Sequence, residues 1–83
     1  MKDLKPISVA AIQMKIVSLD IDTNLQTAKR LLLEAIAKQS LDLVVFPEDC
    51  ITGPIPAHPE YALDVDHYAI QFFRDLAREH QLY

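Results

Sequence analysis

Two short apolar runs on either side of an amphipathic segment constrain most strongly how this chain can fold. Residues 7–14 (ISVAAIQM) and 41–47 (LDLVVFP) are rich in aliphatic and β-branched side chains, and the second run ends in proline. Such runs are typical of strands buried on both faces, as in parallel sheets. A buried helix is the competing interpretation, but both runs are short for a helix. We therefore expect two parallel strands.

The segment between the two runs, residues 24–39, has the periodicity of a helix. Apolar residues recur at spacings of three and four on one face, which Leu31 widens: Leu25, Ala28, Leu32, Ala35 and Ile36. Thr23 followed by Gln26 fits a capping box, so the helix is predicted to start near Asn24. A helix of this length can return the chain beside its first strand, which predicts a right-handed βαβ unit.

A second helix is predicted after a loop rich in proline. The loop contains Gly53, Pro54, Pro56 and Pro59, and we expect these prolines to preclude regular structure there. The helix is expected over residues 65–81, with one face formed by Ala69, Phe72, Phe73, Leu76, Ala77 and His80. The fold class is therefore α/β with βαβα order, and a third strand is expected where the sequence stops.

Two strands and two helices are few elements for an independent domain. The chain has 83 residues and a single glycine, and such a sheet leaves its edges open and its faces incompletely covered. We expect residues 1–83 to be the N-terminal part of one larger domain, or to need partner chains that complete the core.

Charge and composition restrict the possible partners and location. The net charge is −4, and residues 41–83 hold two basic and eight acidic groups, which disfavours nucleic-acid binding. No apolar run approaches membrane-spanning length. The single cysteine cannot form an internal disulfide, which favours a reducing compartment. We expect a cytoplasmic protein that binds neither nucleic acid nor membrane.

Glu48 directly follows the second apolar run, and it is the residue with the clearest chemical potential. In open α/β sheets, chemistry gathers at the carboxyl ends of parallel strands. A carboxylate partly removed from water at such an end accepts protons well. Taken alone, however, a glutamate in an exposed loop is the simpler interpretation.

The ordered set of motifs resembles the N-terminal portion of the nitrilase, or carbon–nitrogen hydrolase, superfamily. The set comprises residues 9–14 (VAAIQM), Asn24-Leu25, residues 43–48 (LVVFPE) and Gly53. The resemblance implies a four-layer αββα sandwich, of which this chain is the βαβα portion. It also implies hydrolysis of amide, nitrile or carbamoyl substrates by a Glu–Lys–Cys triad, with Glu48 as general base. No cofactor or metal is implied, and a homo-oligomer is expected because relatives commonly dimerise.

The other two members of that triad do not match this sequence. All five lysines precede Glu48: Lys2, Lys5, Lys15, Lys29 and Lys38. Cys50 is close to Glu48, but the family's nucleophile belongs to a later strand, and a cysteine here is more typical of packing. We expect the 83 residues alone to be inactive. The proline-rich stretch 54–59 departs from the common family pattern and leaves the substrate class open.

Other functions find weaker support. Residues 20–24 (DIDTN) imitate an EF-hand start, but Leu25 and Leu31 occupy positions that need glycine and glutamate, so helix capping explains them better. His58, His67 and His80 lack metal-ligand spacing, and His80 is expected to pack on its helix. A nucleotide-binding domain would need a glycine-rich loop after the first strand, which is absent. A non-catalytic interaction module remains an alternative.

Overall fold

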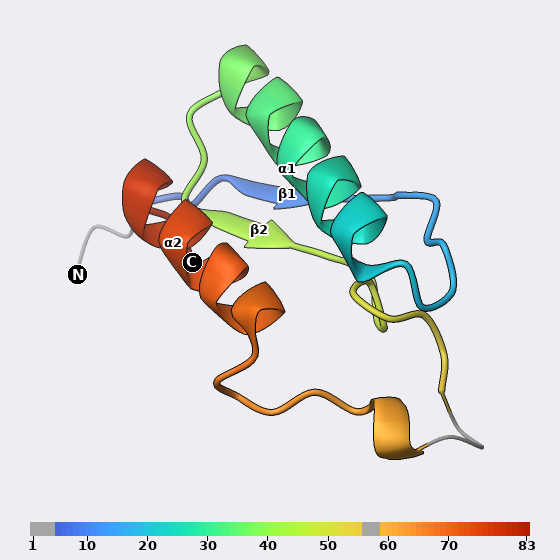
Figure 1. Ribbon diagram of the computed structural model, residues 1–83. Coiled ribbons are helices and arrows are strands. Elements are labelled where there is room, and N and C mark those ends of the chain that lie inside the picture. Colours follow the sequence, from blue (N-terminus) through green and yellow to red (C-terminus); the bar gives the residue numbers. More distant parts are fainter. Residues whose placement is uncertain (1–4, 56–58) are drawn as a thin grey trace.

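The chain alternates strands and helices, which confirms the predicted α/β class (Figure 1). The computed structural model describes residues 5–55 and 59–83. Its elements are β1 (Val9–Ala11), α1 (Ile21–Lys38), β2 (Leu43–Val45), the short 3-10 helix η1 (Pro59–Tyr61) and α2 (Tyr68–His80).

The two strands form a parallel pair, as predicted. Val9 lies opposite Leu43, and Ala11 lies opposite Val45. The ladder continues one step further, where the Ile12 amide donates to the Val45 carbonyl at 2.8 Å. The predicted strands are longer than this pairing, because backbone hydrogen bonds join only the central part of each apolar run.

The chain returns after α2 to the edge of β2 that β1 does not occupy. The Tyr83 amide donates to the carbonyl of Asp42 at 3.1 Å, and the Val44 amide donates to the carbonyl of Tyr83 at 2.9 Å. Two bonds that flank one residue, here Leu43, are the pattern of a parallel ladder. Both edges of β2 are therefore hydrogen-bonded, but the described residues contain two strands, and the third strand stays an expectation.

Helix α1 begins at Ile21, so the capping box predicted from Thr23 is wrong. The Asp20 carboxylate accepts a hydrogen bond from the Thr23 amide at 3.2 Å and caps the helix. The first turn is closed by the Asn24 amide, which donates to the Asp20 carbonyl. Aspartate is a preferred N-cap, and its position three residues earlier places Asn24 inside the helix rather than at its start.

Helix α2 begins at Tyr68, three residues later than predicted. His67 is its N-cap, because Nδ1 of its ring accepts a hydrogen bond from the Ala69 amide at 3.0 Å. The segment before it was predicted to be wholly irregular, but η1 begins at Pro59. A proline at a first helical position loses nothing, since its missing N–H would have no partner there.

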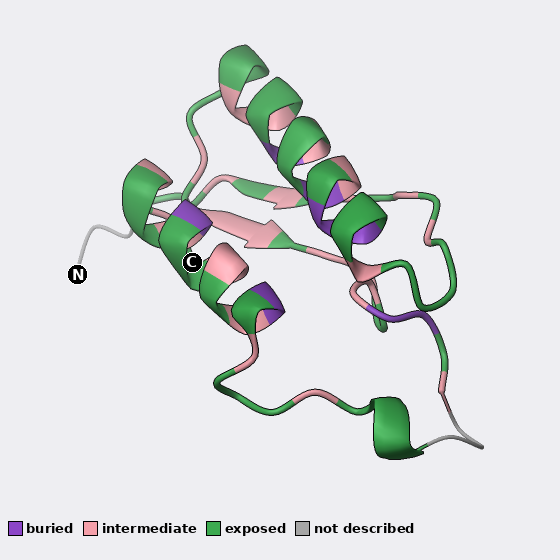
Figure 2. Ribbon diagram, in the orientation of Figure 1, coloured by how far each residue is buried: buried purple, intermediate pink, exposed green. Residues whose placement is uncertain are grey.

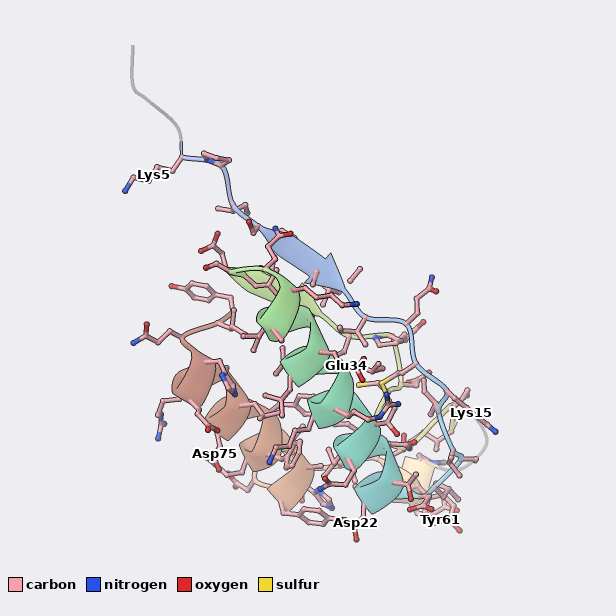
Figure 3. All side chains as sticks on the ribbon, turned by 90° about the horizontal axis from the view of Figure 1, so that it is seen from above. Lys5, Lys15, Asp22, Glu34, Tyr61 and Asp75 are labelled. Carbon is pink, nitrogen blue, oxygen red and sulfur yellow. The ribbon has the colours of Figure 1, made fainter. Side chains whose placement is uncertain are left out.

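Both helices lie on the same side of the strand pair, as Figures 1 and 3 show from two directions. The core between them consists of Leu25, Ala28, Leu32, Ala69 and Leu76. The predicted apolar stripes of both helices are thus confirmed. Asp75 lies on the side of α2 away from α1 (Figure 3), and His80 is half-buried, as expected.

The opposite side of the strand pair is open in the described chain. Val9 and Val45 are each 49% exposed, and no residue of either strand is buried (Figure 2). Side chains alternate between the two faces of a strand, and the helices cover only one of these faces. The prediction of strands buried on both faces is therefore wrong for these residues.

Candidate active site

Glu48 lies in a tight turn directly after β2, at the carboxyl end of the strand pair. Phe46 and Pro47 join it to the strand, and the Gly53 amide closes the turn by donating to the Asp49 carbonyl at 2.8 Å. Glu48 is exposed on this turn. The partial removal from water expected for its carboxylate is therefore absent in the described structure.

The turn and the loop between β1 and α1 both contain left-handed backbone. Asp49 and Leu19 have φ of 57°, and Gly53 has φ of 76°. Glycine accepts this conformation without cost, aspartate does so moderately well, and a branched side chain such as leucine does so poorly. Residues keep such conformations only where the surrounding contacts hold them.

Asn24 links these two loops through its side-chain amide. Its Oδ1 accepts from the Val17 amide at 2.8 Å, and its Nδ2 donates to the carbonyls of Val17 at 2.8 Å and Ile51 at 2.7 Å. The residue is only 1% exposed. Burial of an amide is costly unless its hydrogen bonds are made, and here three are made.

Further contacts join the same two loops. The Leu19 amide donates to the Thr52 carbonyl at 2.7 Å. A Cβ placed on Gly53 would lie 3.4 Å from the Cα of Ser18, so the two backbones are in close contact at this point. The turn that carries Glu48 is therefore attached to the N-terminal end of α1 at several adjacent points.

The surroundings of Cys50 are those of a packing residue and not of a nucleophile activated by Glu48. It is half-buried and lines an apolar cavity of about 390 Å³ between β2, α1 and α2, together with side chains that include Phe46 and Phe73. Burial raises the pKa of the Cys50 thiol, and the charge of Asp49 adds to the effect, while a backbone hydrogen bond opposes it. The nucleophilic thiolate is thus disfavoured.

The apolar cavity does not include Glu48 among its lining residues. Ligand-binding cavities usually combine apolar walls with a few polar groups that point toward the ligand, and this cavity lacks such polar groups. Its walls come from both helices and β2, and also from Pro47, Cys50, Ile51, Leu82 and Tyr83. We therefore assign it to incomplete packing beside α2 and not to catalysis.

The described part of the chain contains no buried or half-buried lysine. The four described lysines are all exposed: Lys5, Lys15, Lys29 and Lys38. Lys15 extends outward from the loop after β1 (Figure 3). Lys2 lies outside the described residues. A lysine that stabilises a developing negative charge would need to face the same space as Glu48.

Metal-binding side chains are not clustered in the described part of the chain. No group of three or more His, Cys, Asp or Glu residues there is placed to hold an ion. His67 caps α2, His80 lies 4.0 Å from Glu79, and His58 lies outside the described residues. No helix between residues 5 and 55 or between 59 and 83 is long and apolar enough to cross a membrane.

In open parallel α/β folds, ligands bind beside the loops at the carboxyl ends of the strands, which is where Glu48 lies. Residues 8–83 match the family model described as carbon–nitrogen hydrolase, and the chain belongs to this family. The predicted resemblance is thereby confirmed. No curated protein and no solved structure matches the chain.

Asn24 is the residue whose importance the sequence interpretation missed. From the sequence it is placed at the opening of the helix and among the family motifs, and no buried contact is predicted for it. Asn24 precedes Ala28 by four residues and Leu32 by eight, which places it on the buried stripe. A polar residue on such a stripe needs buried hydrogen-bond partners, and here they lie in loops before and after the helix.

Proposed function

We propose that Glu48 is the general base of a hydrolase that cleaves non-peptide carbon–nitrogen bonds in amide, nitrile or carbamoyl compounds. The family match supports hydrolysis of this class of bond. The observation that carries the assignment to Glu48 is its place in the turn directly after β2, where a carboxylate can face a substrate above the sheet edge.

The proposed reaction uses a Glu–Lys–Cys triad. Glu48 takes the proton of a cysteine thiol, and the thiolate attacks the amide carbon. A lysine ammonium stabilises the negative charge of the tetrahedral intermediate. The leaving amine receives the proton from Glu48, and a thioester remains. Glu48 then takes a proton from water, which hydrolyses the thioester and releases the acid and the free thiol.

The lysine and the nucleophile of this triad are proposed to lie outside the 83 residues. No lysine follows Glu48 in the sequence. Cys50 is disfavoured as nucleophile, because its raised pKa and its contact with the apolar cavity suit a packing residue. The isolated chain is accordingly proposed to be inactive.

The open side of the strand pair supports the rest of the proposed architecture. In a four-layer αββα sandwich, a second sheet would cover Val9 and Val45, whose exposure is otherwise unusual for a parallel sheet. We further propose a cytoplasmic homo-oligomer that acts on a small molecule and binds neither nucleic acid nor membrane. The acidic balance of residues 41–83 agrees with the exclusion of nucleic acid.

A non-catalytic interaction module is the second candidate. The same exposed valines favour it, because an apolar sheet face is also a surface for another protein. The two candidates differ in what they require of Glu48. Only the hydrolase needs its carboxylate.

The test measures ammonia release from a panel of amides and nitriles by the complete natural polypeptide that contains these residues. Glu48→Gln is expected to lower kcat by a factor on the order of 10²–10⁴, because glutamine cannot accept the proton. Asp49→Asn is the matched control, since it removes the adjacent charge and asparagine tolerates the left-handed backbone of that position. Equal activity of the two variants would contradict the assignment.

A further inference from the structure

The hydrogen bonds of Asn24 select an amide over any other side chain of this size. Two carbonyls and one amide N–H converge on it, from Val17 and Ile51, at 2.7–2.8 Å. Only a carboxamide offers both donors and an acceptor at one end. An aspartate of the same shape would retain the bond from Val17 but could not donate to either carbonyl when ionised.

The bond to Ile51 reaches the turn that carries Glu48. Ile51 follows Glu48 by three residues, and its neighbour Thr52 is held by the amide of Leu19 at 2.7 Å. Two successive carbonyls of the turn are thus fixed from the α1 side. Because residues 49–53 are closed by the Asp49–Gly53 bond, fixing these carbonyls restrains the backbone that directly follows Glu48.

The packing of α1 alone does not call for a polar residue at position 24. The neighbouring stripe positions hold Ala28 and Leu32, and both are fully buried without hydrogen bonds from their side chains. An apolar residue there would fill the same space on the helix but would leave the Val17 amide and the carbonyls of Val17 and Ile51 without these bonds. What the amide adds is direction, since a hydrogen bond sets the relative position of two loops more narrowly than an apolar contact does.

From these contacts we propose that Asn24 is a positioning residue for Glu48. It acts through the carbonyl of Ile51 and sets where the carboxylate stands above the sheet edge. This inference rests on the proposed role of Glu48 as general base. Asn24 itself does not touch the substrate.

The first arm of the test follows amide hydrogen exchange in the natural polypeptide. Asn24→Asp keeps the size of the side chain and removes the two donated bonds. Exchange of the Leu19 and Gly53 amides is expected to accelerate about tenfold or more, while amides in the middle of α1 change less. Leu76→Ala is the matched control, because it destabilises the core from α2 and its side chain makes no hydrogen bond to either loop.

The second arm measures hydrolysis by the same variants. Asn24→Asp is expected to lower kcat by a factor on the order of 100 and to leave KM nearly unchanged, because a misplaced base affects the chemical step. Leu76→Ala, assayed where it remains folded, is expected to retain the wild-type kcat. If Asn24→Asp does not fold, Asn24→Ser takes its place, with a hydroxyl that can donate to one of the two carbonyls.

Two results would overturn the inference. One is an exchange pattern in Asn24→Asp that matches the pattern of Leu76→Ala once global stability is taken into account. The other is faster exchange of the turn amides in Asn24→Asp together with an unchanged kcat, in an enzyme that Glu48→Gln inactivates. If Glu48→Gln stays active, the proposed function fails instead, and the exchange arm alone then decides whether Asn24 holds the turn.

Discussion

Helices α1 and α2 cover the same face of the strand pair, yet they pack against it differently. Four residues of α1 are buried, and they include the amide that joins two loops: Asn24, Leu25, Ala28 and Leu32. In α2 only Ala69 and Leu76 are buried, although its apolar face carries two phenylalanines. The apolar cavity of about 390 Å³ lies where α2, α1 and β2 meet.

This difference follows from what lies beneath each helix. The two loops at the carboxyl end of the β1–β2 pair bond to Asn24 in the first turn of α1, and the buried residues of α1 extend from there to Leu32. Beside α2, the edge of β2 is paired with the backbone of Tyr83. A helix buries its apolar face only as far as a neighbouring surface extends. Helix α1 is therefore joined through Asn24 to the turn that carries Glu48, whereas the packing beside α2 leaves a cavity.

The largest expected effect comes from shortening one leucine on each helix. Leu25→Ala is expected to lower the free energy of unfolding by about 3–5 kcal/mol, because Leu25 is surrounded on all sides. Leu76→Ala should cost less, about 2–3 kcal/mol, since Leu76 already lines the cavity and loses fewer contacts. Urea unfolding of both variants measures the difference. If Leu76→Ala lowers the free energy of unfolding more than Leu25→Ala does, α2 is the more closely packed helix and the comparison is wrong.

Enlarging one alanine on each helix should give effects of opposite sign. Ala28 is 0% exposed, so Ala28→Leu is expected to destabilise the fold by about 1–3 kcal/mol through overpacking. Ala77 lines the cavity, and Ala77→Leu should be neutral or stabilise by about 0.5–1 kcal/mol. Thermal unfolding compares the two variants. Destabilisation by Ala77→Leu would mean that the space beside α2 is not available.

Cys50 tests the character of the cavity wall. Burial raises the pKa of its thiol, so the reactive thiolate is scarce near neutral pH and increases as pH rises. Alkylation by iodoacetamide is expected to be slower than that of free cysteine, and its rate should still be rising above about pH 8.5, the ordinary thiol pKa. Fast alkylation near neutral pH would instead favour Cys50 as a nucleophile.

The smallest expected effect concerns the contact between the N-terminal ends of the two helices. The Tyr68 hydroxyl donates to Asp22 at 2.7 Å, and this hydrogen bond raises the pKa of Tyr68, with smaller contributions from desolvation and from the charges of Asp22 and Asp20. A pKa raised on folding stabilises the protein below the ordinary tyrosine value of about 10, and this stabilisation is lost as pH rises through the folded value.

Tyr68→Phe should therefore lower stability slightly at neutral pH, and its difference from the wild type should shrink above about pH 10. Urea unfolding at several pH values measures this. Asp22→Asn is the companion variant, because it removes the carboxylate that accepts the bond. A difference that stays constant across this range would show that the contact does not depend on the proton of Tyr68.

The sequence predicted most of the secondary structure and the place of Glu48 along the chain. Periodicity identified the buried stripe of α1 and the apolar face of α2, because both depend on local spacing. It misjudged where α1 begins, since Thr23–Gln26 and Asp20 both look like caps and only the folded backbone selects one. It also overstated strand burial, because an apolar run does not reveal how many of its faces have a partner.

By itself, then, the sequence determined the family, the α/β order and the candidate base, since ordered motifs and hydrophobic spacing are properties of neighbouring residues. Tertiary structure alone decided that Asn24 joins the loop after β1 to the turn after β2, although Asn24 and Ile51 are 27 positions apart in the sequence. It also decided that Cys50 faces an apolar cavity and that Glu48 is exposed. Contacts between distant segments depend on how the chain is packed, and a local pattern does not contain that information.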